Sequence, residues 1–260
     1  MIAVCIATYN HEAFIEQAVA SVQAQICEED IRIYIGDDAS TDGTEAICRS
    51  LAKADKRIVY VRRERNLGLV ANTIDLYRRI ITDGCDFIAM LDGDDYWTDE
   101  RKLQMQIDYL QAHPEIGLVH TAVEGQKDEA VPTGDLSERY NLQGARHTNC
   151  TVVFRTSLLH EDELKDIEQQ HFPVLDYPLY GIFAQQTCFA YLPEKTAVWR
   201  QHNSVSQPIH FGTYKHYKKE RIRMWKWLEE KYPNRFHFSQ FKAFVWLNKQ
   251  LFAFFCEKMK

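Results

Sequence analysis

The chain has 260 residues, of which 45% are apolar and 26% charged, and its formal net charge at pH 7 is −6. This length and composition are typical of a globular protein with a substantial core. The negative charge argues against nucleic acid as a partner, because affinity for nucleic acid depends on a basic surface.

Seven cysteines are scattered singly through the chain, and no two form a C-x-x-C pair. This distribution favours neither a zinc site nor a disulfide framework and indicates a reducing environment. The N-terminus lacks the features of a signal peptide, and no apolar stretch reaches the roughly 20 residues that span a bilayer. We therefore expect a cytoplasmic protein, with peripheral contact at the inner face of the cell membrane left open.

Two periodicities alternate over the first half of the chain. Short continuous apolar runs predict strands covered on both faces at 2–7, 31–36, 57–61, 86–91 and 117–123. Between them, apolar residues at helical spacing predict helices, with stripes at Ile15–Val22, Val70–Ile81 and Leu103–Leu110. Repeated units of this kind predict an α/β fold with a Rossmann-like, mostly parallel central sheet flanked by helices.

Two helix starts carry capping patterns. Asp42, with Glu45 three residues later, has the spacing of an N-cap with a glutamate that reaches back. Thr98 is the expected cap of the next helix after the fourth strand, with Asp99 and Glu100 in its first turn.

The pattern loosens after Val123. Residues 124–146 are polar and predict a long loop, followed by a strand at 151–154, a helix at 177–186 and a strand at 191–199. Residues 214–232 are basic and aromatic. We favour helices that pack on the rest of the protein over helices that contact a membrane surface.

Polar clusters follow three of the predicted strands: Thr8–Asn10, Asp37–Asp42 and Asp92–Asp95. In open parallel sheets the carboxyl ends of the strands meet at one edge, and ligands bind there. Asp92, Asp94 and Asp95 repel one another unless a cation lies between them. Mg²⁺ and Mn²⁺ favour such oxygen ligands, although solvated turns use the same residues.

Four motifs occur in order: Ala7-Thr-Tyr-Asn10, Asp37-Asp-Ala-Ser-Thr-Asp-Gly-Thr44, Asn66-Leu-Gly68 and Leu91-Asp-Gly-Asp-Asp95. Together they resemble glycosyltransferase family 2, the inverting nucleotide-sugar transferases of GT-A fold. The likeness is dense over about the first 120 residues and continues thinly to about Ser206. It implies a nucleotide-sugar donor, Mg²⁺ or Mn²⁺ bound at the DxD motif, and direct displacement at the anomeric carbon.

The resemblance assigns the donor to Ala7, Thr8, Tyr9, Asn10, Asp37, Asp38, Asn66, Gly68, Asp92, Gly93, Asp94 and Arg200. Tyr9 offers a ring on which a base would stack. Asp38, or alternatively Asp37, resembles the uracil reader of the family, since a carboxylate accepts the imide N–H. Asn66 and Gly68 precede a helix N-terminus, where backbone N–H groups can meet phosphate oxygens.

For the metal, the resemblance implies Asp92 and Asp94, with Asp95 and His202 as further ligands and Arg200 at the diphosphate. The cation would stabilise the leaving group. Inversion also needs a general base, and Asp176 matches the position of the family's acidic pair, although Leu175 replaces the first acid. Asp176 alternatively only caps its helix. His147, Thr148 and Asn149 are further candidates that face the acceptor.

These residues predict a transferase that moves a sugar from a UDP-sugar to a saccharide or lipid-linked acceptor in surface polysaccharide or glycolipid synthesis. We expect a catalytic domain at 1–210, with a donor half at 1–120 and an acceptor half at 121–210, and a helical extension at 211–260. Leu175 keeps open a nucleotide-sugar-binding protein without catalysis. A phosphatase of the haloacid dehalogenase type is a further alternative, but its D-x-D follows the first strand.

Overall fold

The computed structural model describes residues 1–125, 148–200 and 211–233. His202, residues 126–147, which hold most of the loop predicted at 124–146, and the Phe- and Trp-rich segment after 233 lie outside these residues. Among the described residues, no helix is both long and apolar enough to cross a lipid bilayer.

A single eight-stranded sheet forms the centre of the molecule, in the order β3-β2-β1-β4-β7-β6-β8-β5. Pairing is parallel from β3 to β4 and between β6 and β8, and the short β7 and β5 are antiparallel to their neighbours. The predicted α/β fold with a mostly parallel sheet is confirmed. The strands are β1 (Ile2–Thr8), β2 (Ile31–Asp37), β3 (Ile58–Arg62), β4 (Phe87–Asp92), β5 (Tyr96–Trp97), β6 (Ile116–Val123), β7 (Val153–Arg155) and β8 (Cys188–Val198).

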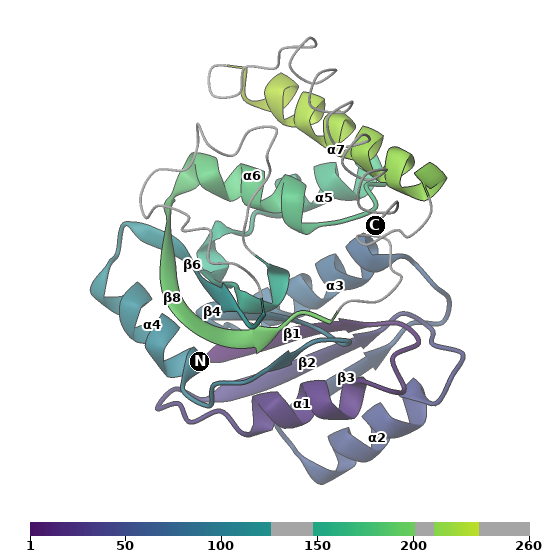
Figure 1. The fold of residues 1–260 in the computed structure, drawn as a ribbon, viewed down its shortest axis with the longest axis vertical. Helices are drawn as coiled ribbons and strands as arrows, with labels where there is room; N and C mark the ends of the chain where they lie inside the picture. Colours follow the sequence, from purple (N-terminus) through teal and green to yellow (C-terminus); the bar gives the residue numbers. More distant parts are fainter. Residues whose placement is uncertain (126–147, 201–210, 234–260) are drawn as a thin grey trace.

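Helices cover both faces of this sheet (Figure 1). The first face carries α1 (Ile15–Gln23), α2 (Thr44–Ala54) and α4 (Lys102–Ala112), whose apolar residues share one core cluster with the strands. The second face carries α3 (Leu69–Thr82), α5 (Glu161–Gln170), α6 (Asp176–Gln186) and α7 (Phe211–Lys231), which contribute to a second core cluster. Because both faces are covered, the central strands are apolar throughout, and this is why their sequences do not alternate.

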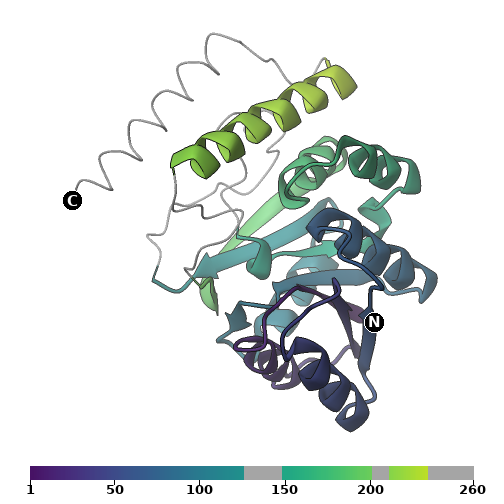
Figure 2. The ribbon, with the colours of Figure 1, turned by 90° about the vertical axis from the view of Figure 1, so that its right-hand side faces the viewer.

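Helix α7 packs against α6, on the side of α6 that faces away from the central sheet (Figure 2). Met224, Trp225 and Leu228 are at most 2% exposed and belong to the same core cluster as α3 and α6. A Cβ on Gly181 of α6 would lie 2.5 Å from a methyl carbon of Leu228, so the absence of a side chain allows the close packing. The expectation that aromatic residues of the segment 214–232 serve packing is confirmed for Trp225. The division into domains at 120 and 210 stays a prediction.

The structure corrects three local predictions. Thr98 does not cap α4, which begins at Lys102 after a turn in which the Asp99 carboxylate accepts the N–H of Arg101 at 2.8 Å. Glu45 does not reach back to Asp42, because its carboxylate pairs with arginines instead. The predicted apolar stripe of α3 ended at Ile81, but Ile81 is 39% exposed and the neighbouring Ile80 is buried in its place. Helix α5 was not predicted, since its sequence is strongly polar with only Leu164 and Ile167 buried.

Candidate active site

Strand register brings the predicted polar clusters to one edge of the sheet. Thr8 pairs with Asp37 on one side of β1, and Ala7 pairs with Asp92 on the other. The three strands therefore end together, and the residues after them surround a cleft of about 720 Å³. Helix α6, on the second face of the sheet, contributes Asp176 and Tyr180 to the lining of the cleft.

Most predicted site residues line this cleft: Ala7, Thr8, Tyr9, Asn10, Asp38, Asn66, Gly68, Asp92, Asp94, Asp95, Thr148, Asn149 and Asp176. Three do not line it, namely Asp37, Gly93 and Arg200. Gly93 is nevertheless required beside it, because a Cβ there would lie 2.8 Å from both the Thr8 hydroxyl and the His11 ring. His147 and His202 lie outside the described residues.

Two of the three clustered carboxylates, those of Asp92 and Asp95, accept hydrogen bonds from distant parts of the chain. Asp92 accepts hydrogen bonds from the Asn149 amide on both oxygens, each at 3.1 Å. Burial, followed by the charges of Asp95 and Asp94, raises its pKa well above the usual range. Asp95 is 1% exposed and accepts the backbone N–H of Arg200 at 2.9 Å. Burial, with the charge of Asp94, raises the pKa of Asp95 to about 7.

A divalent cation fits this cluster chemically. Gathering carboxylates at a buried position costs free energy that a cation would offset, and the raised pKa values express that cost. Among residues 1–125, 148–200 and 211–233, no three His, Cys, Asp or Glu side chains are arranged to hold a metal together. Mg²⁺ commonly combines one or two carboxylates with substrate phosphates. Asp92 and Asp94 would thus hold the cation together with oxygens of a bound ligand.

Arg200 supports the acidic turn from outside the cleft. Its guanidinium lies 4.6 Å from the ring centre of Tyr96 and 5.0 Å from that of Phe14. It donates to the backbone carbonyl of Asp94 and to the Gln17 side chain. In this structure the Arg200 guanidinium is held against aromatic rings and the protein backbone, and its contact with the diphosphate stays a prediction.

Tyr9 and Asp38, which the sequence assigns to the donor, both line the cleft. Tyr9 is 42% exposed, which leaves its ring accessible to a ligand. The Asp38 carboxylate accepts the backbone N–H groups of Leu67 and Gly68 at 2.7 and 2.8 Å. It thereby anchors the loop before α3, in which Gly68 has a φ of +86° that favours glycine. Asp38 itself is 3% exposed and lines the cleft.

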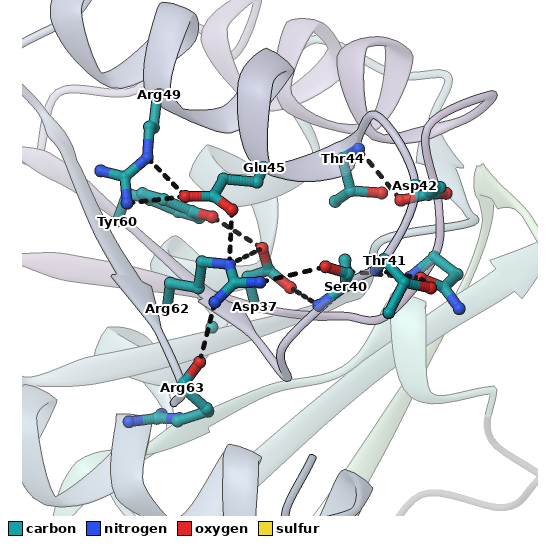
Figure 3. A network of polar contacts seen from close by, with 12 residues as sticks. Asp37, Ser40, Thr41, Asp42, Thr44, Glu45, Arg49, Tyr60, Arg62 and Arg63 are labelled. Carbon is teal, nitrogen blue, oxygen red and sulfur yellow. Dashed lines mark hydrogen bonds and ion pairs between the residues drawn. The ribbon is translucent and has the colours of Figure 1, made fainter. Parts of the chain in front are cut away.

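Asp37 does not line the cleft. It belongs to a network of polar contacts that stabilises the β2–α2 loop (Figure 3). It is fully buried, accepts the Ser40 N–H at 2.8 Å and the Tyr60 hydroxyl at 2.6 Å, and lies 3.8 Å from Arg62. Successive residues of a strand face opposite sides of the sheet, so the two adjacent aspartates separate. The alternative that Asp37 reads the base is corrected in favour of a structural role.

We expect Asp37→Asn to lower stability by about 1–3 kcal/mol, because a buried acceptor of two hydrogen bonds loses its charge beside Arg62. Thermal unfolding would show a fall of about 2–4 °C per kcal/mol in a chain of this size. Glu45→Gln, which changes a partly exposed partner of Arg62, is the control and should cost less. Unchanged stability with weakened nucleotide binding would instead make Asp37 a ligand contact.

Asp176 is the first residue of α6 and lines the cleft. Burial raises its pKa, while the charge of Arg221 on α7 and the N–H of Tyr177 act in the opposite direction. Arg221 is itself held over the Tyr177 ring, 5.0 Å from its centre. The helix start and Arg221 keep the ionised form accessible, and burial increases its basicity.

Sequence reasoning did not identify several residues that line the cleft. These residues are His11, Phe14, Tyr180, Trp199 and Tyr217. Asn149 was a candidate only for the acceptor, yet it binds Asp92. Spacing after Asp176 would have suggested Tyr180, since residues four apart share a helix face.

Several solved structures share this fold, including one from Staphylococcus aureus and one from Pyrobaculum calidifontis. The chain superposes on Staphylococcus aureus TarS, solved in complex with UDP, with a TM-score of 0.59 and 16% identity, over 96% of this chain and 70% of that one. For the mannosyltransferase PcManGT from Pyrobaculum calidifontis, in complex with GDP-Man and Mn²⁺, the TM-score is 0.61 at 17% identity, over 97% and 74%. The fold is thus that of the GT-A glycosyltransferases.

The sequence comparisons define the family. The model for glycosyl transferase family 2 matches residues 3–158, and the chain belongs to this family. An uncharacterized protein of Mycobacterium tuberculosis is 34% identical over 208 residues, which are 75% of this chain and 57% of the relative. The dTDP-rhamnosyl transferase RfbG of Shigella flexneri is 27% identical over 218 residues, 79% of this chain and 75% of its own. The chain therefore spans little more than half the length of the mycobacterial relative.

Proposed function

We propose that this protein is an inverting glycosyltransferase that takes a sugar from a nucleotide-sugar, with a UDP-sugar as the expected donor. The observation that carries the proposal is the convergence of Tyr9, Asp38, Asp92 and Asp94 with Asp176 around one cleft. Family membership supports the reaction class. The acceptor we propose is a saccharide or a lipid-linked saccharide of surface polysaccharide or glycolipid synthesis.

On the donor side, Tyr9 would stack on the base. Asp38 would accept the imide N–H of the base while it holds the loop at Leu67 and Gly68. Uracil and thymine present the same imide edge, so a UDP-sugar and a dTDP-sugar both suit this arrangement. The UDP in the TarS structure and the name of RfbG agree with a pyrimidine nucleotide. The GDP-Man of PcManGT shows that the fold also holds a purine nucleotide.

Asp92 and Asp94 would hold Mg²⁺ or Mn²⁺ at the diphosphate. When bound, the cation neutralises charge that develops on the departing diphosphate. Asp176 would accept the proton of the acceptor hydroxyl. The Oδ1 of Asp95 accepts the backbone N–H of Arg200, so Asp95 would support the turn rather than the ligand.

Calorimetry tests the donor site directly. We expect UDP to bind the wild-type protein, with an affinity at least about tenfold higher in Mn²⁺ than in a chelator, a gain of about 1.4 kcal/mol. Titrations with dTDP and GDP under the same conditions compare the bases. A protein that binds none of the three nucleotides, with or without Mn²⁺, contradicts the proposed donor site.

A further inference from the structure

A chain of two hydrogen-bonded side chains joins the two walls of the cleft. Asn149, in the short 3-10 helix Asn149–Thr151, donates its amide to both oxygens of Asp92 at 3.1 Å. The oxygen of the same amide accepts the Tyr180 hydroxyl at 2.8 Å. Tyr180 lies on α6, one helical turn after Asp176. The acidic turn after β4 is thus linked to the helix that begins with Asp176.

We propose that Asn149 and Tyr180 are positioning residues that set the location of Asp92 relative to Asp176. This inference rests on the proposed function, in which Asp92 lies at the donor and Asp176 at the acceptor. The two carboxylates must act on opposite sides of the same anomeric carbon. Their relative position therefore determines whether a bound donor is aligned for attack.

The chemistry of the Asn149 amide suits this role. An amide offers two donors and one acceptor group, and both ends are used here. Hydrogen bonds to a carboxylate are stronger than those between neutral groups, and Asp92 is repelled by Asp94 and Asp95. Without the amide, Asp92 would turn to relieve this repulsion. A misplacement of about 1 Å at a reacting centre can cost about 100-fold in rate.

Tyr77 provides a matched comparison within the same cleft. Like Tyr180 it is 1% exposed and lines the cleft. Its hydroxyl donates to the Met90 sulfur at 3.2 Å, so it is hydrogen-bonded without reaching Asn149. Substitution of either tyrosine by phenylalanine removes one buried hydroxyl, but only at Tyr180 is the link to Asp92 broken.

A double-mutant cycle tests the inference. The variants are Tyr180→Phe, Asn149→Ala and the two combined, and the readouts are kcat and KM for nucleoside diphosphate release, Kd for UDP with Mn²⁺, and Tm. We expect Tyr180→Phe to lower kcat about tenfold and Asn149→Ala about 100-fold. The double variant should be no slower than Asn149→Ala alone, because residues that act as a unit are not additive. For Tyr180→Phe, the Kd for UDP should stay within about twofold of wild type.

Two further variants keep the result interpretable. Asn149→Asp keeps the size of the side chain and the acceptor for Tyr180 but replaces the donor to Asp92, so it should lose at least as much kcat as Asn149→Ala. Tyr77→Phe, combined with Asn149→Ala, should show independent effects that multiply.

The inference is overturned if the effects of Tyr180→Phe and Asn149→Ala multiply, or if Tyr180→Phe behaves as Tyr77→Phe does. It is also overturned if Asn149→Asp turns over as fast as wild type. A wild-type protein that neither binds nor hydrolyses a nucleotide-sugar overturns the proposed function together with the inference. An active wild type with multiplying effects overturns the inference alone.

Discussion

Asp176→Asn should reduce nucleoside diphosphate release at least about 100-fold, because a general base contributes about 10²–10⁴ to the rate. The amide keeps the size of the carboxyl group but cannot accept the proton. Binding of UDP with Mn²⁺ should stay near wild type, since Asp176 begins α6 and is not part of the proposed donor or metal site. Steady-state turnover and calorimetry measure the two effects separately.

The pKa of Asp176 also predicts how turnover depends on pH. Burial raises the pKa, so the group is protonated, and inactive as a base, further toward neutral pH than an ordinary aspartate. Turnover should therefore fall as the pH drops through the raised pKa. Because the folded protein disfavours the ionised form, Asp176→Asn should leave Tm at pH 7 unchanged or raise it.

Asp162→Asn is the matched control for Asp176. Asp162 also lies in the first turn of a helix, α5, but is exposed. It should change neither turnover nor nucleotide binding. Retained turnover in Asp176→Asn, at a rate similar to that of Asp162→Asn, would remove Asp176 from the mechanism.

Asp94→Ala should abolish the increase in UDP affinity that Mn²⁺ causes. In the proposed site only Asp92 and Asp94 supply carboxylate oxygens for the cation, and the removal of one leaves a single ligand for a hard ion that needs several. The expected loss is at least about tenfold in affinity, or about 1.4 kcal/mol. Calorimetry with UDP in Mn²⁺ and in a chelator measures it.

Glu100→Ala is the control for this effect, since Glu100 is an exposed acid a few residues beyond the same turn. It changes the net charge by the same amount and should preserve the response to Mn²⁺. If Asp94→Ala responds to Mn²⁺ as Glu100→Ala does, the cation is not held by the DxD motif.

The fold was largely predictable because its signals are local. Continuous apolar runs marked β1, β2, β3, β4 and β6, since strands covered on both faces need apolar residues at every position. The misplaced start of α4 and the missed α5 have different reasons. The segment before α4 is held by a contact with a distant residue, the hydrogen bond from the Thr98 N–H to the Thr196 carbonyl, which leaves no periodic signal. Helix α5 is strongly polar and buries only Leu164 and Ile167, too few apolar residues to mark a helical stripe.

The amino-acid sequence by itself determined which strand ends carry chemistry, because the order of the motifs identifies the family and parallel pairing brings those ends to one edge. Only the tertiary structure decided which of the neighbouring side chains line the cleft and which contact the protein instead. Asp37 turns to Tyr60 and Asp38 to the cleft, Arg200 stacks on Tyr96 instead of entering the cleft, and Asn149 binds Asp92. The physical reason is that side-chain direction at a strand end depends on partners far away in the chain, and residue type alone does not encode those partners.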